Sequence, residues 1–126
     1  MEKITLISFG FLNGLPAQAD TVLDVRGLKN PFYIHELKDK SGLDPEVRDY
    51  IFSYPETAEY LDAITELLRI RLKLYAQWDS PNRHPLTIAI GCTGGRHRSV
   101  AMTEALAERL RALGCEIVIR HRDLKP

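Results

Sequence analysis

The chain has 126 residues, enough for one domain with a single hydrophobic core. Lys and Arg together number 17, as do Asp and Glu, so no net positive charge attracts nucleic acid over a distance and only a local basic patch could do so. With 44% hydrophobic and 27% charged residues, the composition is that of an ordinary soluble protein, and no apolar run is long enough to span a membrane. We therefore expect no membrane partner.

The two cysteines, Cys92 and Cys115, have no metal-ligand spacing, and the first residues do not form a secretion signal. Free thiols of this kind are typical of cytoplasmic proteins. We expect a cytoplasmic protein without a metal or another cofactor.

The first part of the chain predicts two strands. Residues 3–9 alternate in polarity and end at Gly10, and residues 21–25 are mostly apolar, which favours an internal strand. Asn30 and Pro31 mark a turn, after which residues 32–34 are apolar enough to anchor a loop in the core. Residues 38–42 form a polar and mobile connection.

Two helices are predicted next. Asp44 is a suitable N-cap for a helix that runs to about Phe52. Ser53 and Glu56 have the spacing of a capping box, which predicts the start of a long amphipathic helix. Trp78, at its end, is expected in the core, and the two prolines of residues 79–85 predict a loop.

The second half predicts a strand, a helix and a final strand. Residues 86–90 form an apolar, β-branched run, residues 100–113 have apolar side chains at helical spacing, and Gly114 is a suitable helix end. Residues 115–120 form the last strand. Alternation of strands and helices predicts a single α/β domain over residues 1–126, with a mainly parallel sheet of about four strands and flanking helices.

Polar residues follow each predicted strand. In a parallel sheet the carboxyl ends of the strands lie at one edge, where ligands bind. We therefore expect a site that combines Asp24, Arg26 and Asn30 with the segment from Cys92 to Ser99 and with His121 and Arg122.

The glycine-rich turn after residues 86–90 has the features of an anion site. Gly94 and Gly95 allow the backbone to approach a ligand, and a helix start provides unpaired N–H groups and a favourable dipole. Arg98 offers a bidentate fork for phosphate. The predicted ligand contacts in this turn are Cys92, Thr93, Gly94, Gly95, Arg96, His97, Arg98 and Ser99.

Some of these residues also fit other roles. Cys92, Arg98 and Ser99 have the spacing of the loop in cysteine phosphatases, but Gly91 stands where those enzymes usually carry His, so a small buried cysteine is the preferred interpretation. Asp24 could bind a ligand hydroxyl or amine, or form a salt bridge with Arg26 or Arg98. Arg120, His121 and Arg122 form either a basic rim for phosphate or RNA, or solvated terminal charges.

The chain resembles the C-terminal domain of RapZ, the bacterial RNase adapter protein. The resemblance is carried, in order, by Ile7 to Phe11, Leu23 to Pro31, Ser41 to Asp44, Val47 to Tyr50, Thr87 to Val100 and Ile119 to Arg122. It implies a fold similar to part of a sugar-phosphate kinase, binding of glucosamine-6-phosphate and of a small regulatory RNA, and presentation of that RNA to an endoribonuclease. It also implies ligand-loop roles for Thr93, Gly94, Gly95, His97 and Arg98, with Asp24 and Cys92 nearby.

The chain departs from that family in several places. It has no P-loop motif, so the resemblance implies a stand-alone domain, with a separate nucleotide-binding chain as one expected partner. Leu12 and Asn13 replace basic or aromatic residues, Phe32 stands where some members have His, and the tail from Asp123 lacks a Lys–Arg cluster. Because the basic positions are thinned while the loop is kept, phosphate-ligand binding is expected to survive better than RNA binding.

The sequence therefore predicts a non-catalytic regulator that senses a phosphorylated small molecule, with an amino-sugar phosphate as the expected ligand and phosphate or sulfate as simpler ones. An RNA-binding adaptor is the alternative, and a cysteine phosphatase is a weaker one. We also expect a homo-oligomer.

Overall fold

The computed structural model describes residues 2–78 and 84–125, so the greater part of the loop predicted at residues 79–85 lies outside the described residues. Four strands form one sheet in the order β2-β3-β1-β4, and all three neighbouring pairs are parallel. The predicted α/β class with a parallel sheet is confirmed. The strands are β1 (Lys3–Gly10), β2 (Thr21–Asp24), β3 (Leu86–Cys92) and β4 (Glu116–His121).

The register brings the carboxyl ends of the strands to one edge. Gly10 at the end of β1 pairs with Cys92 at the end of β3, and Asp24 of β2 pairs with Gly91. On the other side of β1, His121 of β4 pairs with Ser8. The segments that follow the four strands therefore begin near one another, as the sequence predicted.

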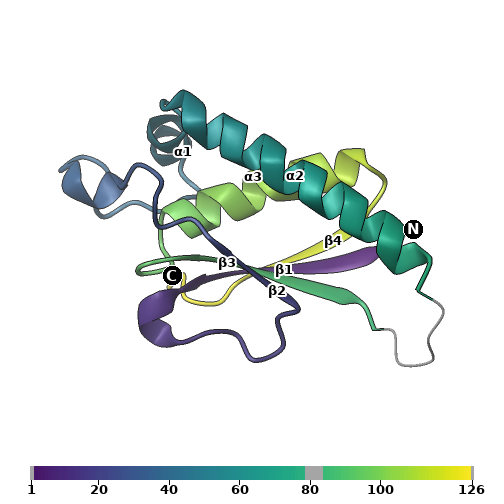
Figure 1. Ribbon diagram of the computed structural model, residues 1–126. Helices are drawn as coiled ribbons and strands as arrows, with labels where there is room; N and C mark the ends of the chain where they lie inside the picture. The colour runs from purple at the N-terminus through teal and green to yellow at the C-terminus, as the bar shows by residue number, and fades with distance from the viewer. Residues whose placement is uncertain (1, 79–83, 126) are drawn as a thin grey trace.

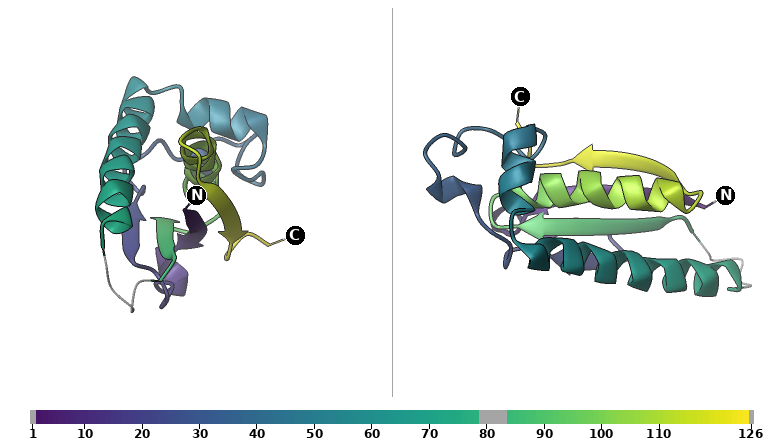
Figure 2. Two further views of the ribbon diagram at one scale, coloured as in Figure 1. Left: turned by 90° about the vertical axis from the view of Figure 1, so that its right-hand side faces the viewer. Right: turned by 90° about the horizontal axis from the view of Figure 1, so that it is seen from above.

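The α-helices lie on one face of the sheet (Figures 1 and 2). Their apolar sides and the facing strand residues form the main core, in which Leu6, Ile88 and Leu106 are fully buried. The segment of residues 11–20 runs along the opposite face, where Pro16 is buried (Figure 1). No described helix is long and apolar enough to cross a membrane. The helices are α1 (Pro45–Ile51), α2 (Pro55–Ala76) and α3 (Arg98–Ala112), with the short 3-10 turns η1 (Phe11–Asn13) and η2 (Pro31–Tyr33).

The prediction that β2 is internal is wrong. This strand pairs with β3 alone and lies at the edge of the sheet. Leu23 is buried against the helices, but Val22 on the other side is 41% exposed. A short apolar run does not distinguish an edge strand, with one side packed, from an internal strand.

The capping box at Ser53 and Glu56 is also wrong. Helix α2 begins at Pro55 with Tyr54 as its N-cap, and the Ser53 hydroxyl instead donates to the backbone carbonyl of Tyr50 at 2.6 Å. Proline favours the first helical position, which sets the start one residue later than the predicted box. Trp78, predicted in the core, is 48% exposed beyond the end of this helix.

Of residues 32–34, predicted to anchor this turn in the core, only Ile34 does so: it is partly buried and packs against a small core cluster that includes Val47 and Ile51. Pro31 is buried, whereas Phe32 and Tyr33 are 51% and 80% exposed. The Asn30 side chain accepts a hydrogen bond from the Phe32 N–H at 3.1 Å and so caps η2. Pro31 therefore occupies the buried position of this turn, and the rings of Phe32 and Tyr33 lie at the surface.

Candidate functional site

The loop of residues 93–97 joins β3 to α3 and packs against the end of β1. Gly95 has a φ of +80°, which L side chains rarely adopt, and a Cβ there would lie 2.6 Å from the Gly10 nitrogen. A Cβ on Gly10 would in turn lie 2.4 Å from the carbonyl carbon of Gly94. Two glycines are therefore needed where the loop and the strand end touch, in agreement with a backbone-lined site.

The backbone N–H groups of the loop have no protein partner. In the described part of the chain, none of the N–H groups from Thr93 to His97 donates a hydrogen bond, although Gly95 and His97 are buried residues. Buried backbone N–H groups are nearly always paired with protein, water or ligand. The run leads directly into the first turn of α3, whose N–H groups are also unpaired by helix geometry. Consecutive free N–H groups at a helix start form an anion-binding arrangement.

Arg98 is the first residue of α3 and is only 5% exposed. One terminal nitrogen donates to the backbone carbonyls of Arg26 and, at 3.3 Å, Leu28; the other lies 3.4 Å from the Thr93 hydroxyl. Its Nε–H has no hydrogen-bond partner, and no carboxylate of the described residues forms an ion pair with it. A buried guanidinium without a carboxylate leaves positive charge uncompensated beside the loop.

Two neighbouring side chains fix the loop to the segment before α1. Arg96 donates to the backbone carbonyls of Asp39 and Lys40, and His97 Nε2 lies 3.1 Å from the carbonyl of Lys38. Burial lowers the pKa of the His97 imidazole, so the neutral form with its proton on Nε2 suits this contact. The segment predicted as a mobile connection is therefore bound to the loop through its backbone.

These elements enclose a groove of about 720 Å³ at the carboxyl edge of the sheet. It falls within the range of about 300–1,000 Å³ for small-molecule sites. Seven of the predicted ligand residues line it: Asn30, Cys92, Thr93, Gly94, Arg96, His97 and Arg98. Gly95 and Ser99 support the loop from behind and do not line the groove.

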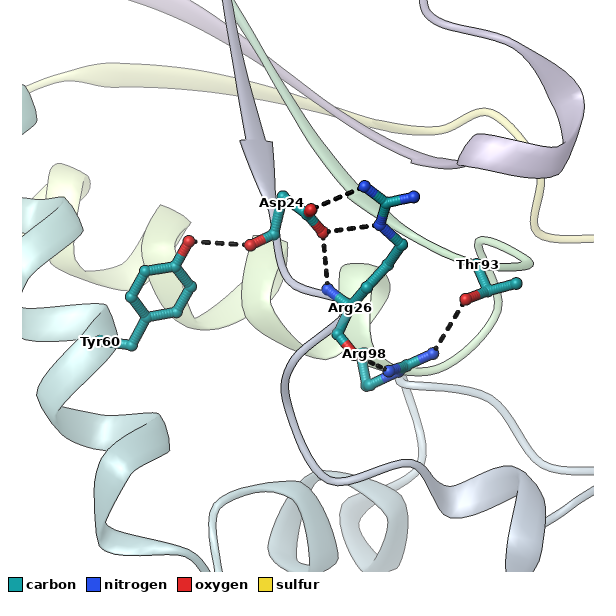
Figure 3. A network of polar contacts seen from close by, with 5 residues as sticks. All are labelled: Asp24, Arg26, Tyr60, Thr93 and Arg98. Carbon is teal, nitrogen blue, oxygen red and sulfur yellow. Dashed lines mark hydrogen bonds and ion pairs between the residues drawn. The ribbon is translucent and has the colours of Figure 1, made fainter.

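Asp24 and Arg26, also predicted as ligand contacts, do not line this groove. The Asp24 carboxylate forms a two-point ion pair with the Arg26 guanidinium at 2.8 and 3.0 Å, and it accepts the Arg26 backbone N–H. This partner lowers the pKa of the Asp24 carboxyl. Figure 3 shows the pair beside Arg98, which lies between Thr93 and the backbone of Arg26. Of the alternatives for Asp24, the structure has the Arg26 ion pair.

Cys92 and Ser99 contact each other at the base of the loop. The Cys92 thiol is 2% exposed and donates to the fully buried Ser99 hydroxyl at 3.2 Å. One of the two terminal nitrogens of Arg98, which a phosphatase would direct at its substrate, instead donates to protein carbonyls. This arrangement agrees with the preferred structural interpretation of Cys92.

The predicted basic rim at the end of β4 is largely bonded within the protein. His121 joins the buried Ser8 hydroxyl, 2.6 Å from Nδ1, to the Glu104 carboxylate, 2.8 Å from Nε2. Arg122 donates to Asp123 and to the backbone carbonyls of Asn13 and Gly14 at the end of η1. Arg120 is exposed on β4. RNA binding by these residues stays a prediction.

Asp123 lines the groove, and its carboxylate accepts the Gly10 N–H at 2.7 Å. Burial raises the pKa of this carboxyl, but hydrogen bonds from Arg122 and Gly10 outweigh burial and the net pKa is lowered. The remaining residues that line the groove are Leu12, Phe32, Tyr33, Lys38, Asp39 and Lys125. The sequence suggested no ligand role for most of them. The aromatic residues after Asn30-Pro31 were a usable signal. Within residues 2–78 and 84–125, no three His, Cys, Asp or Glu side chains are arranged to hold a metal ion.

The chain is similar over almost its whole length to longer bacterial proteins. It is 48% identical over 122 residues to a nucleotide-binding protein of Thermobifida fusca, covering 97% of this chain and 40% of that protein. A nucleotide-binding protein of Bifidobacterium adolescentis is 49% identical, with 97% and 38% covered, and one of Finegoldia magna is 44% identical, with 97% and 42% covered. The chain thus spans about two fifths of these relatives. The RapZ C-terminal domain family matches residues 2–125, and the chain belongs to this family.

Proposed function

We propose that this domain is a non-catalytic regulator that binds a phosphorylated small molecule at the groove, with the phosphate held by the loop of residues 93–97. An amino-sugar phosphate such as glucosamine-6-phosphate is the ligand that the family resemblance implies. The observation that carries the proposal is the run of unpaired N–H groups from Thr93 to His97 beside the buried guanidinium of Arg98.

The electrostatics of the groove support an anion. Arg98 lacks a carboxylate partner among the described residues, and the loop N–H groups lie at the start of a helix of 15 residues. A doubly charged phosphate provides the acceptors and the negative charge that these donors require. A neutral sugar provides neither, so the phosphate is expected to dominate the affinity.

Isothermal titration tests this proposal with glucosamine-6-phosphate, glucosamine and inorganic phosphate. We expect the phosphorylated sugar to bind at least tenfold more tightly than glucosamine, and inorganic phosphate to compete with it. Equal, weak binding of all three would contradict a phosphate site. Binding of glucosamine-6-phosphate no tighter than inorganic phosphate would remove the sugar-specific part alone.

A matched pair of variants locates the site. Arg96→Met removes a cation that lines the groove and fixes the loop, whereas Arg111→Met removes an exposed cation from the far end of α3. We expect the first to weaken binding of glucosamine-6-phosphate about tenfold and the second to leave it unchanged. Equal losses in both would indicate nonspecific attraction by net charge.

A further inference from the structure

Two exposed aromatic rings stand on the wall of the groove. Phe32 and Tyr33 both line it while 51% and 80% exposed, and their ring centroids are 5.6 Å apart at an angle of 85°. Leu12, 79% exposed, adds a third apolar group to the same groove. Single exposed apolar side chains are ordinary, but a cluster that lines a hollow marks a binding surface.

Phe32 is held by its neighbours and does not rely on a ligand for its position. Its backbone N–H donates to the Asn30 side chain at 3.1 Å, and the Ile34 N–H donates to the buried Pro31 carbonyl at 2.9 Å. The Lys38 ammonium lies 5.3 Å from the centre of the Phe32 ring. Because the backbone of this turn is already fixed, less ordering is needed for the Phe32 ring to contact a ligand.

The phosphate alone would occupy a small part of the groove. Its volume of about 720 Å³ accommodates a drug-sized molecule. The polar loop from Thr93 to His97 and the apolar wall at Phe32 therefore divide it into two parts of different chemistry. A ligand that fits both has a phosphate at one end and an apolar, ring-shaped surface at the other.

We propose that Phe32 is a stacking platform, with Tyr33 at its edge, for the ring of a cyclic phosphomonoester whose phosphate is held by the loop. This inference rests on the proposed function and narrows its ligand class to phosphates carried by a ring with an apolar face. A nucleobase and a pyranose both have such a face, whereas an open-chain phosphate does not. Phe32 is then a specificity-determining residue of the site.

The test is isothermal titration of the wild-type protein, Phe32→Ala and Phe32→Tyr with four ligands: inorganic phosphate, glycerol 3-phosphate, glucosamine-6-phosphate and adenosine 5′-monophosphate. Aromatic stacking in nucleic-acid sites corresponds to about 5- to 150-fold in affinity. We expect Phe32→Ala to weaken binding of a ring phosphate about tenfold and to leave both ring-free phosphates unchanged, and Phe32→Tyr to retain tight binding. Leu67→Ala, which removes an apolar side chain of α2 that is 48% exposed, is the matched control.

The outcomes separate this inference from the function on which it rests. Loss in Phe32→Ala confined to adenosine 5′-monophosphate assigns the platform to a nucleobase, and loss confined to glucosamine-6-phosphate assigns it to a sugar ring. Unchanged affinity for both ring phosphates, with phosphate still bound, overturns the platform and leaves the phosphate site intact. If the wild-type protein binds none of the four ligands, the phosphate site itself fails.

Discussion

Two turns at the carboxyl edge of the sheet both carry arginine but differ in how its charge is paired. The turn after β2 has an acid and an arginine that form an ion pair with each other, Asp24 with Arg26. Among the described residues, the loop after β3 has N–H groups without protein partners and is followed by the buried Arg98, which forms no ion pair with a carboxylate. In the first turn the two charged side chains pair with each other, whereas in the second the backbone N–H groups remain available to a ligand.

The comparison shows that residue type at a strand end is a weak guide to which polar groups stay unpaired. What matters is whether the polar groups are already satisfied within the protein. Arg98 links the two turns, because it donates to the backbone carbonyls of Arg26 and Leu28 from the start of α3. The turn after β2 therefore supports the loop after β3, although its Asp24 and Arg26 side chains do not line the groove.

The largest expected effect comes from Gly95→Ala, which forces apart the loop after β3 and the end of β1. The new Cβ would combine a φ of +80° with contacts of 2.6 and 2.8 Å to the backbone of β1. Left-handed backbone and overpacking each cost roughly 1–3 kcal/mol, so urea unfolding should show a loss of about 2–6 kcal/mol. Gly94→Ala is the control, because a Cβ there meets nothing within 4 Å. Equal losses in both variants would contradict the close packing of Gly95.

A smaller effect is expected when the link between the two turns is removed. Arg98→Met keeps much of the buried volume but removes the donors to the carbonyls of Arg26 and Leu28. We expect a loss of about 2 kcal/mol in urea unfolding, together with faster hydrogen exchange of the Leu28 amide. Added phosphate should stabilise the wild-type protein and not this variant. An unchanged exchange rate of the Leu28 amide would show that the turn after β2 is stable without Arg98.

The fold follows from the sequence more fully than the site does. Strand and helix periodicity locates the parallel sheet, and the sheet brings the strand ends together, so residues 92–99 could be placed at one edge in advance. Periodicity does not report hydrogen bonds between distant segments. The bond from Arg96 to the carbonyls of Asp39 and Lys40 depends on how a loop folds back, and no local pattern encodes it.

The aromatic residues after Asn30 are a second case that sequence patterns do not predict. Hydrophobicity predicts burial for Phe32 and Tyr33, yet Pro31 takes the buried position and the rings line the groove. Exposed apolar residues that line a groove depart from the burial rule, as a surface that binds a partner outside the chain would. Two aromatic residues beside a predicted turn are a signal in the sequence, but only the structure shows that they are exposed and line the groove.

The pH dependence of stability should depend on His97 in the loop after β3. Burial lowers the pKa of His97 in the folded protein below its ordinary value of 6.5, so the unfolded chain binds a proton more readily. Stability from this residue is complete above that value and declines as pH falls below it. Urea unfolding between pH 7.5 and about pH 5 should show a shallower decline in His97→Asn. An equally steep decline in the variant would assign the effect to other groups.

The smallest effect is expected for Asp24→Asn in the turn after β2. The variant loses the charge of a half-exposed ion pair but keeps an oxygen to accept the Arg26 N–H, and the Tyr60 hydroxyl still donates to the backbone carbonyl of residue 24. Stability should stay within about 0.5 kcal/mol of the wild type, since surface substitutions of this kind rarely exceed that. Because this side chain does not line the groove, titration with glucosamine-6-phosphate should give an unchanged affinity. A tenfold loss of affinity at unchanged stability would place Asp24 among the ligand contacts. It would also remove the distinction between the turn after β2, with its charges paired, and the loop after β3, with its N–H groups available.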